Sequence, residues 1–70
     1  MPRGAVQWFN DAKGYGFIVG ADGREVFVHY SSISSVGFRS LNAGQLVDYE
    51  EVPGLRGPYA VRLSVVADPA

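Results

Sequence analysis

Apolar side chains recur at every second position in five short segments of this chain, and none of these segments carries the 3.6-residue apolar stripe of a long helix. A period of two is typical of β-strands, because successive side chains point to opposite faces of a sheet. The expected strands are residues 5–10, 13–20, 25–30, 45–52 and 59–66. Between the third and fourth strands, only a short helical turn is expected, near residues 31–33. The pattern therefore predicts an all-β fold.

Turn-forming residues separate the expected strands. They are Asn10 and Asp11, the Ala-Asp-Gly run at 21–23, Pro53 and Gly54, and Gly57 and Pro58. A chain of 70 residues has room for one hydrophobic core. Five short strands suit a small closed or nearly closed barrel, since closure removes the exposed strand edges that invite aggregation. We expect a single domain over residues 1–70.

Two neighbouring strands are apolar on both faces. Tyr15 and Phe17 share one face of the second strand, and Phe27 and His29 share one face of the third. The aliphatic residues expected in the core are Ile18, Val26, Val28, Val47, Val61, Leu63 and Val65. The aromatic residues can also be interpreted as core, but burying both faces requires a second layer that so short a chain does not provide. We therefore expect an exposed aromatic face, and such a patch marks a binding surface.

Trp8 does not follow the simple alternation. An unbroken first strand places Trp8 on the same face as Val6, which has the character of a core residue. A bulge between the two would separate them. The alternative is a partly buried Trp8 with a structural role. Gly14 and Gly16 likewise have two interpretations, as room for a ligand-binding surface or as purely architectural residues at a sharp bend.

The expected aromatic surface suits unpaired bases. Its members are Trp8, Tyr15, Phe17, Phe27, His29, Tyr30 and Phe38. Unpaired bases stack on aromatic rings with about 1–3 kcal/mol per base, whereas paired bases hide their faces inside a duplex. A single strand is therefore the favoured ligand.

Several motifs, in this order, give the chain a specific resemblance. They are WFN at 8–10, KGYGFI at 13–18, VFVHY at 26–30, Ser-Ser-Ile at 31–33, GFRSL at 37–41 and RGPYA at 56–60. The run KGYGFIV also matches much of the RNA-recognition-motif signature, but that fold needs two helices that this chain lacks. The chain resembles the bacterial cold-shock protein family, whose members are five-stranded antiparallel OB-type barrels that bind single-stranded RNA and DNA.

The resemblance implies a function and a site. It implies an ATP-independent RNA chaperone that keeps transcripts unstructured and affects transcription or translation, and that works as a monomer without a cofactor. The family's stacking positions fall on the seven aromatic and histidine residues named above, and its polar or basic contacts fall on Lys13 and Arg56. The chain departs from the family pattern at Gln7, where a lysine is usual, and at Tyr59, where a polar or small residue is common. Glu51 interrupts the alternation of the fourth strand, which either ends early or bulges there.

The charge of the chain does not by itself favour a polyanionic partner, because the formal net charge is -1 and the pI is near 5.6. However, Asp48, Glu50 and Glu51 gather on the fourth strand, away from the aromatic strands. Lys13, Arg56 and Arg39 can then place positive charge around the edge of the aromatic face. The alternative is that each is an ordinary solvated charge.

Other classes of function have less support in the sequence. An enzyme needs a reacting constellation, yet the chain has one His, one Lys, no Cys and no metal-ligand or phosphate-binding spacing. A small barrel that binds proline-rich peptides or oligosaccharides remains the alternative. The start of the chain lacks the features of a signal peptide, and no apolar run approaches the roughly 20 residues of a membrane span. We expect a cytoplasmic protein that does not bind a membrane.

Overall fold

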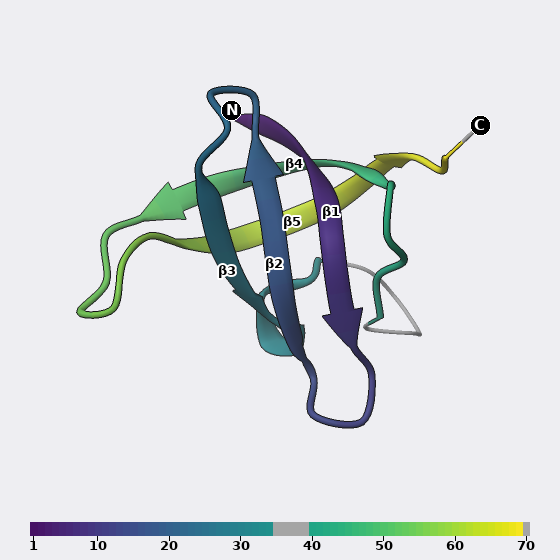
Figure 1. Cartoon of the computed structure of the whole chain (residues 1–70), viewed down its shortest axis with the longest axis horizontal. Coiled ribbons are helices and arrows are strands. Elements are labelled where there is room, and N and C mark those ends of the chain that lie inside the picture. The colour runs from purple at the N-terminus through teal and green to yellow at the C-terminus, as the bar shows by residue number, and fades with distance from the viewer. Residues whose placement is uncertain (35–39, 70) are drawn as a thin grey trace.

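A computed structural model describes residues 1–34 and 40–69 of the chain. Its strands are β1 (Arg3–Asn10), β2 (Tyr15–Gly20), β3 (Glu25–His29), β4 (Leu46–Val52) and β5 (Tyr59–Ala67), and a short 3-10 turn, η1, covers Tyr30–Ser32 (Figure 1). The strands close into a barrel in the order β1-β2-β3-β5-β4. This confirms the predicted all-β, five-stranded barrel.

Four of the five strand contacts are antiparallel. The contact between β3 and β5 is parallel and joins Phe27 to Tyr59. In Figure 1, β1, β2 and β3 lie side by side, and β4 and β5 run across them. No helix within residues 1–34 and 40–69 has the length and apolar character needed to cross a membrane.

The two hairpin turns form where the sequence predicts them. Between β1 and β2, the backbone N–H of Lys13 donates to Asn10 Oδ1 at 2.9 Å, and that of Gly14 donates to the Asn10 carbonyl at 2.7 Å. Between β2 and β3, the backbone N–H of Arg24 donates to Asp22 Oδ1 at 3.1 Å. Asn and Asp favour turns because their side chains accept such local bonds.

The core is aliphatic except for one tyrosine. Its members are Val6, Ile18, Val26, Val28, Ile33, Leu41, Val47, Tyr49, Ala60 and Leu63. Five of the seven expected core residues are confirmed, but the expectation for β5 was partly wrong, because Val61 is only half-buried and Val65 is 42% exposed.

Irregular pairing between β4 and β5 explains this difference. Asp48 pairs with Ser64 but Glu50 pairs with Val61, so β5 carries one extra residue there. Arg62 adopts a positive φ of 53° at this point. The bulge breaks the alternation of β5, and Ala60 and Leu63 point inward instead. Since β4 continues to Val52, the strand does not end early at Glu51, and its irregularity lies just before that residue.

Candidate functional site

Four aromatic rings from β1, β2 and β3 form a closed cycle on the outside of the barrel. The centroid of the Trp8 ring lies 5.7 Å from that of Tyr15 and 5.5 Å from that of Phe17. Phe27 completes the cycle, with its ring centroid 5.8 Å from that of Tyr15 and 5.7 Å from that of Phe17. We call Trp8, Tyr15, Phe17 and Phe27 the aromatic cluster. Trp8 and Phe27 are 40% and 36% exposed, whereas Tyr15 and Phe17 are half-buried.

The strand register places these rings on one face. Phe17 pairs with Phe27 across β2 and β3, and the neighbouring residues Ile18, Val26 and Val28 are buried. The predicted separation of an aromatic face from an aliphatic face is therefore confirmed. Contacts between the rings remove only part of their apolar surface from water. A ligand that covers this face would bury more of that surface, which favours binding.

A bulge in β1 brings Trp8 to this face. Val6 pairs with Ile18 and Trp8 pairs with Phe17, so Gln7 is an extra residue without a partner in β2. Val6 is therefore buried while Trp8 is exposed, and the predicted bulge is confirmed. Gly16 permits the close approach of β1, because a Cβ at this position would collide with the Trp8 carbonyl oxygen and lie 2.7 Å from Phe9 Cα.

His29 and Tyr30 extend the aromatic face toward the first hairpin turn. Their ring centroids lie 4.4 Å apart, and Tyr30 is 44% exposed. The Tyr30 ring packs over Gly14, where a Cβ would lie 2.6 Å from Tyr30 Cδ1 and where φ is +76°. His29 Nδ1 accepts from the backbone N–H of Ser31 at 3.3 Å and lies 2.8 Å from Ser31 Oγ. In a neutral ring this geometry assigns the proton to Nε2, which is then the donor available to a ligand.

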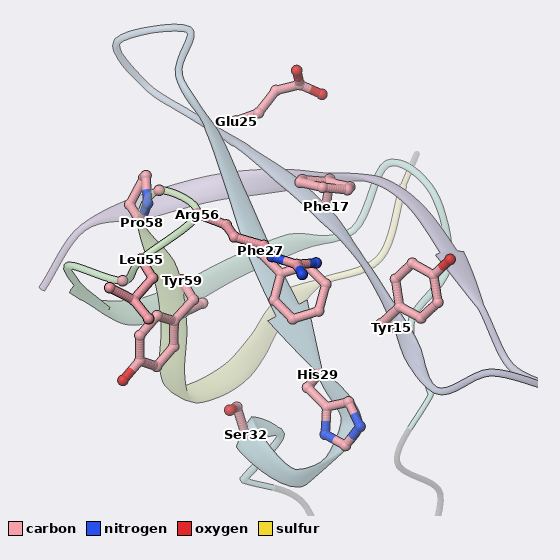
Figure 2. A pocket seen from close by; sticks show the side chains of 13 residues that line it. Tyr15, Phe17, Glu25, Phe27, His29, Ser32, Leu55, Arg56, Pro58 and Tyr59 are labelled. Atoms are coloured by element: carbon pink, nitrogen blue, oxygen red, sulfur yellow. The ribbon is translucent and has the colours of Figure 1, made fainter.

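A groove of ≈ 630 Å³ lies between the aromatic cluster and the loop that joins β4 to β5 (Figure 2). Its lining includes Tyr15, Phe17, Phe27, His29 and Arg56, all of which the sequence placed in the site. The lining residues that sequence reasoning did not assign to the site are Glu25, Ser32, Gly54, Leu55, Gly57, Pro58, Tyr59 and Ala60. Glu25 could have been predicted from the sequence, because the period of two in this strand places it on the same face as Phe27 and His29.

Most cations of the barrel are paired with carboxylates. Arg3 bonds Asp48 at 2.8 Å, Arg24 bonds both Asp22 at 2.8 Å and Glu51 at 2.5 Å, and Arg62 lies 3.8 Å from Glu50. The hydrogen bond from Arg3 lowers the pKa of Asp48, and the backbone N–H of Arg24 lowers the pKa of Asp22. Three of these four carboxylates, Asp48, Glu50 and Glu51, lie on β4, which is adjacent to neither β2 nor β3 in the barrel.

Lys13 and Arg56 form no ion pair among residues 1–34 and 40–69. Arg56 lines the groove, and Lys13 lines a smaller hollow of ≈ 300 Å³ together with Asp11 and Tyr30. Of the Lys and Arg side chains in the described residues, the two predicted for the site are therefore the ones without an ion pair. Phe38 and Arg39 lie outside the described residues. In the described part of the chain, no three His, Cys, Asp or Glu side chains are grouped so as to hold a metal ion.

Comparison with known proteins gives consistent matches. The profile of the 'Cold-shock' DNA-binding domain matches residues 2–66. The chain is 52% identical over 63 residues to Cold shock protein 2 of Lactiplantibacillus plantarum, an alignment that covers 90% of this chain and 96% of that protein. It is equally similar, with the same coverage, to Cold shock protein CspB of Geobacillus stearothermophilus. The solved structure of drosophila Unr CSD456 superposes with a TM-score of 0.76 at 14% identity, over 93% of this chain and 26% of that one, a likeness of fold alone.

Proposed function

This chain belongs to the family of 'Cold-shock' DNA-binding domains, and we propose that it binds single-stranded RNA and DNA by stacking unpaired bases on the aromatic cluster. The cycle of four rings carries this proposal, because it places four neighbouring aromatic rings on the outside of a closed barrel. Each base that stacks on such a ring contributes about 1–3 kcal/mol. The proposed domain spans the whole chain, residues 1–70.

The unpaired cations support an anionic ligand. Lys13 and Arg56 flank the aromatic face at opposite loops, where each can meet a phosphate of a strand whose bases lie on the rings. Each phosphate contact with a single strand adds about 0.7 to the slope of log K against log salt. Two contacts therefore predict a moderate salt dependence, with stacking as the larger part of the affinity.

We propose a passive chaperone mechanism for the same surface. A protein that binds only the open strand shifts the equilibrium away from hairpins by mass action, without ATP. Transcripts held open in this way are accessible to the machinery of transcription and translation. The proposed site of action is the cytoplasm, and each monomer carries a complete binding face. No catalytic step is part of the proposal.

A fluorescence titration tests the proposed ligand. Trp8 is the single tryptophan of the chain and belongs to the aromatic cluster, so its emission reports directly on occupation of the face. We expect a saturable change with unstructured RNA and DNA oligonucleotides of equal sequence, and little change with either duplex or with a proline-rich peptide. Tight binding of a matched duplex would contradict stacking, and saturable binding of the peptide alone would favour a peptide-binding barrel.

A further inference from the structure

The groove has a second aromatic wall, which is not part of the aromatic cluster. Tyr59 begins β5, is 37% exposed, and pairs with Phe27 in the parallel contact between β3 and β5. The next residue, Ala60, is buried, so the alternation of the strand turns Tyr59 outward to the face that carries Phe27. In Figure 2, Tyr59 and Leu55 lie on the loop side of the groove, and Tyr15 and Phe17 lie on the other side.

The loop backbone supports the Tyr59 ring. A Cβ on Gly54 would lie 2.9 Å from Tyr59 Cδ1 and 3.2 Å from Cε1, so the ring rests against this glycine. The loop itself is closed by the backbone N–H of Gly57, which donates to the Gly54 carbonyl at 3.1 Å. A ring held in place before binding loses little conformational freedom when a ligand covers it, and that favours affinity.

The Tyr59 ring is separated from the aromatic cluster by the groove. Within the described residues it makes no ring-to-ring contact, although Phe27 is its neighbour across the sheet. Arg56, from the same loop as Gly54, extends its side chain toward Phe27 in Figure 2, whereas the carboxylate of Glu25 points away from Tyr59. The groove beside Tyr59 thus reaches the aromatic cluster, and its lining includes Arg56, which forms no ion pair with any residue that the structure describes.

We propose that Tyr59 provides an additional stacking position for one unpaired base of a single-stranded nucleic acid, beyond the aromatic cluster, with Arg56 near the adjoining phosphate. This inference rests on the proposed function. It extends the site by one nucleotide. A planar base fits better than a bulky side chain, because aromatic side chains stand on both sides of the groove.

The test compares Tyr59→Leu, which removes the ring but keeps an apolar side chain, with Tyr59→Phe, which keeps the ring. Each protein is titrated with oligothymidines of increasing length, with Trp8 fluorescence as the readout. For oligonucleotides that fill the site, Tyr59→Leu should bind about 5- to 150-fold more weakly, as expected for one lost stacking contact. Its affinity should also stop rising at a length one nucleotide shorter than in the parent. Tyr59→Phe should match the parent within about twofold.

Two controls separate binding from folding. Val66→Ala changes an exposed residue near the other end of β5, outside the groove, and should leave both affinity and length dependence unchanged. If Tyr59→Leu does not fold, the aromatic NMR resonances of Tyr59 in the parent protein provide the same test, because a stacked base shifts them upfield.

The possible failures are distinguishable. If the parent binds oligothymidine but Tyr59→Leu shows the same affinity and the same limiting length, the additional position is refuted while the proposed function stands. Tyr59 resonances that do not move at saturation would have the same meaning. If the parent binds no single strand at all, the proposed function fails, and this inference fails with it.

Discussion

One residue, Gln7, determines which face of the barrel Trp8 joins. As the extra residue of the β1 bulge, it reverses the alternation between Val6 and Trp8. The sequence predicts a bulge here, because a regular strand would place Val6 and Trp8 on the same face, so that Val6 could not be buried while Trp8 is exposed. Deleting a residue here would turn Trp8 inward and remove one ring from the aromatic cluster.

The exposed side chain at position 7 also permits a test of the proposed phosphate path. Gln7→Lys should increase the magnitude of the salt slope by about 0.7 and tighten binding at low salt, because one more phosphate would be neutralised. The fold should tolerate the change, since a lysine can lay its stem on the surface and keep its charge in water. The measurement is a series of oligo-pyrimidine titrations at several salt concentrations, read by Trp8 fluorescence.

A matched control places the same charge elsewhere. Ser64→Lys introduces a lysine at an exposed position of β5, opposite Asp48 and outside the groove, and should leave the slope unchanged. If the Gln7→Lys line ran parallel to that of the parent with no gain in affinity, residue 7 would not meet the backbone of the ligand.

At the scale of the strand, the alternation of apolar residues predicts the buried face correctly where the strand pairing is regular. β2 and β3 pair without a shift from Tyr15 to Val19, and their two faces were predicted correctly. β5 carries bulges, and residues 61 and 65 were assigned wrongly to the core. The positive φ of Arg62 has no signature in its residue type, because a left-handed conformation usually indicates Gly, Asn or Asp.

The second wall of the groove could not be predicted from local patterns. It depends on the parallel contact between Phe27 and Tyr59, which are far apart in the sequence, and on the path of the loop between β4 and β5. Period-two alternation shows which residues share a face of one strand, but it does not show which strands become neighbours. For that reason the sequence identified most of the cluster side of the site and left Leu55, Pro58 and Tyr59 unassigned.

Neighbouring residues of β3 test the separation of the two faces. Phe27→Ala should weaken binding by about 1–3 kcal/mol and cost less stability than the roughly 3–5 kcal/mol of a buried Phe→Ala. Val28→Ala should do the opposite, with a loss of about 1–3 kcal/mol in the free energy of unfolding and little change in affinity, because Val28 is fully buried. Urea unfolding gives the change in stability of each variant, and oligonucleotide titration gives the change in its affinity. The reverse order would mean that the aromatic face is structural.

At the scale of the whole molecule, the arrangement of charge matters more than its sum. The net charge is -1, yet the carboxylates of β4 are paired with Arg3, Arg24 and Arg62. Exposed pairs of this kind contribute little to stability. Their larger effect is to neutralise the acidic strand, and in the described part of the chain Lys13 and Arg56 are the cations left for a ligand.

The one tyrosine of the core makes stability depend on alkaline pH. Burial, followed by the nearby carboxylates of Glu51 and Asp22, raises the pKa of Tyr49. Because the folded-state pKa lies above the unfolded value of about 10, Tyr49 costs no stability below that pH, and stability falls as the pH rises through the folded pKa. Tyr49→Phe should therefore lose less stability between about pH 9 and pH 11, as measured by urea unfolding at each pH. Equal losses in the two proteins would show that other groups cause the alkaline transition.

The passive mechanism sets a limit on which structures the protein opens. At a free protein concentration of 100 times the dissociation constant, binding shifts the folding equilibrium of an RNA hairpin by about 2.7 kcal/mol per bound protein. A hairpin labelled with a fluorophore and a quencher, with one binding site and a stability of about 2 kcal/mol, should therefore open largely, whereas one of about 5 kcal/mol should stay closed. Phe17→Ala should shift the opening curve to higher protein concentration, because it removes one ring of the aromatic cluster. ATP should have no effect. Opening of the more stable hairpin by a single bound protein, or a requirement for ATP, would contradict a mechanism that depends on binding energy alone.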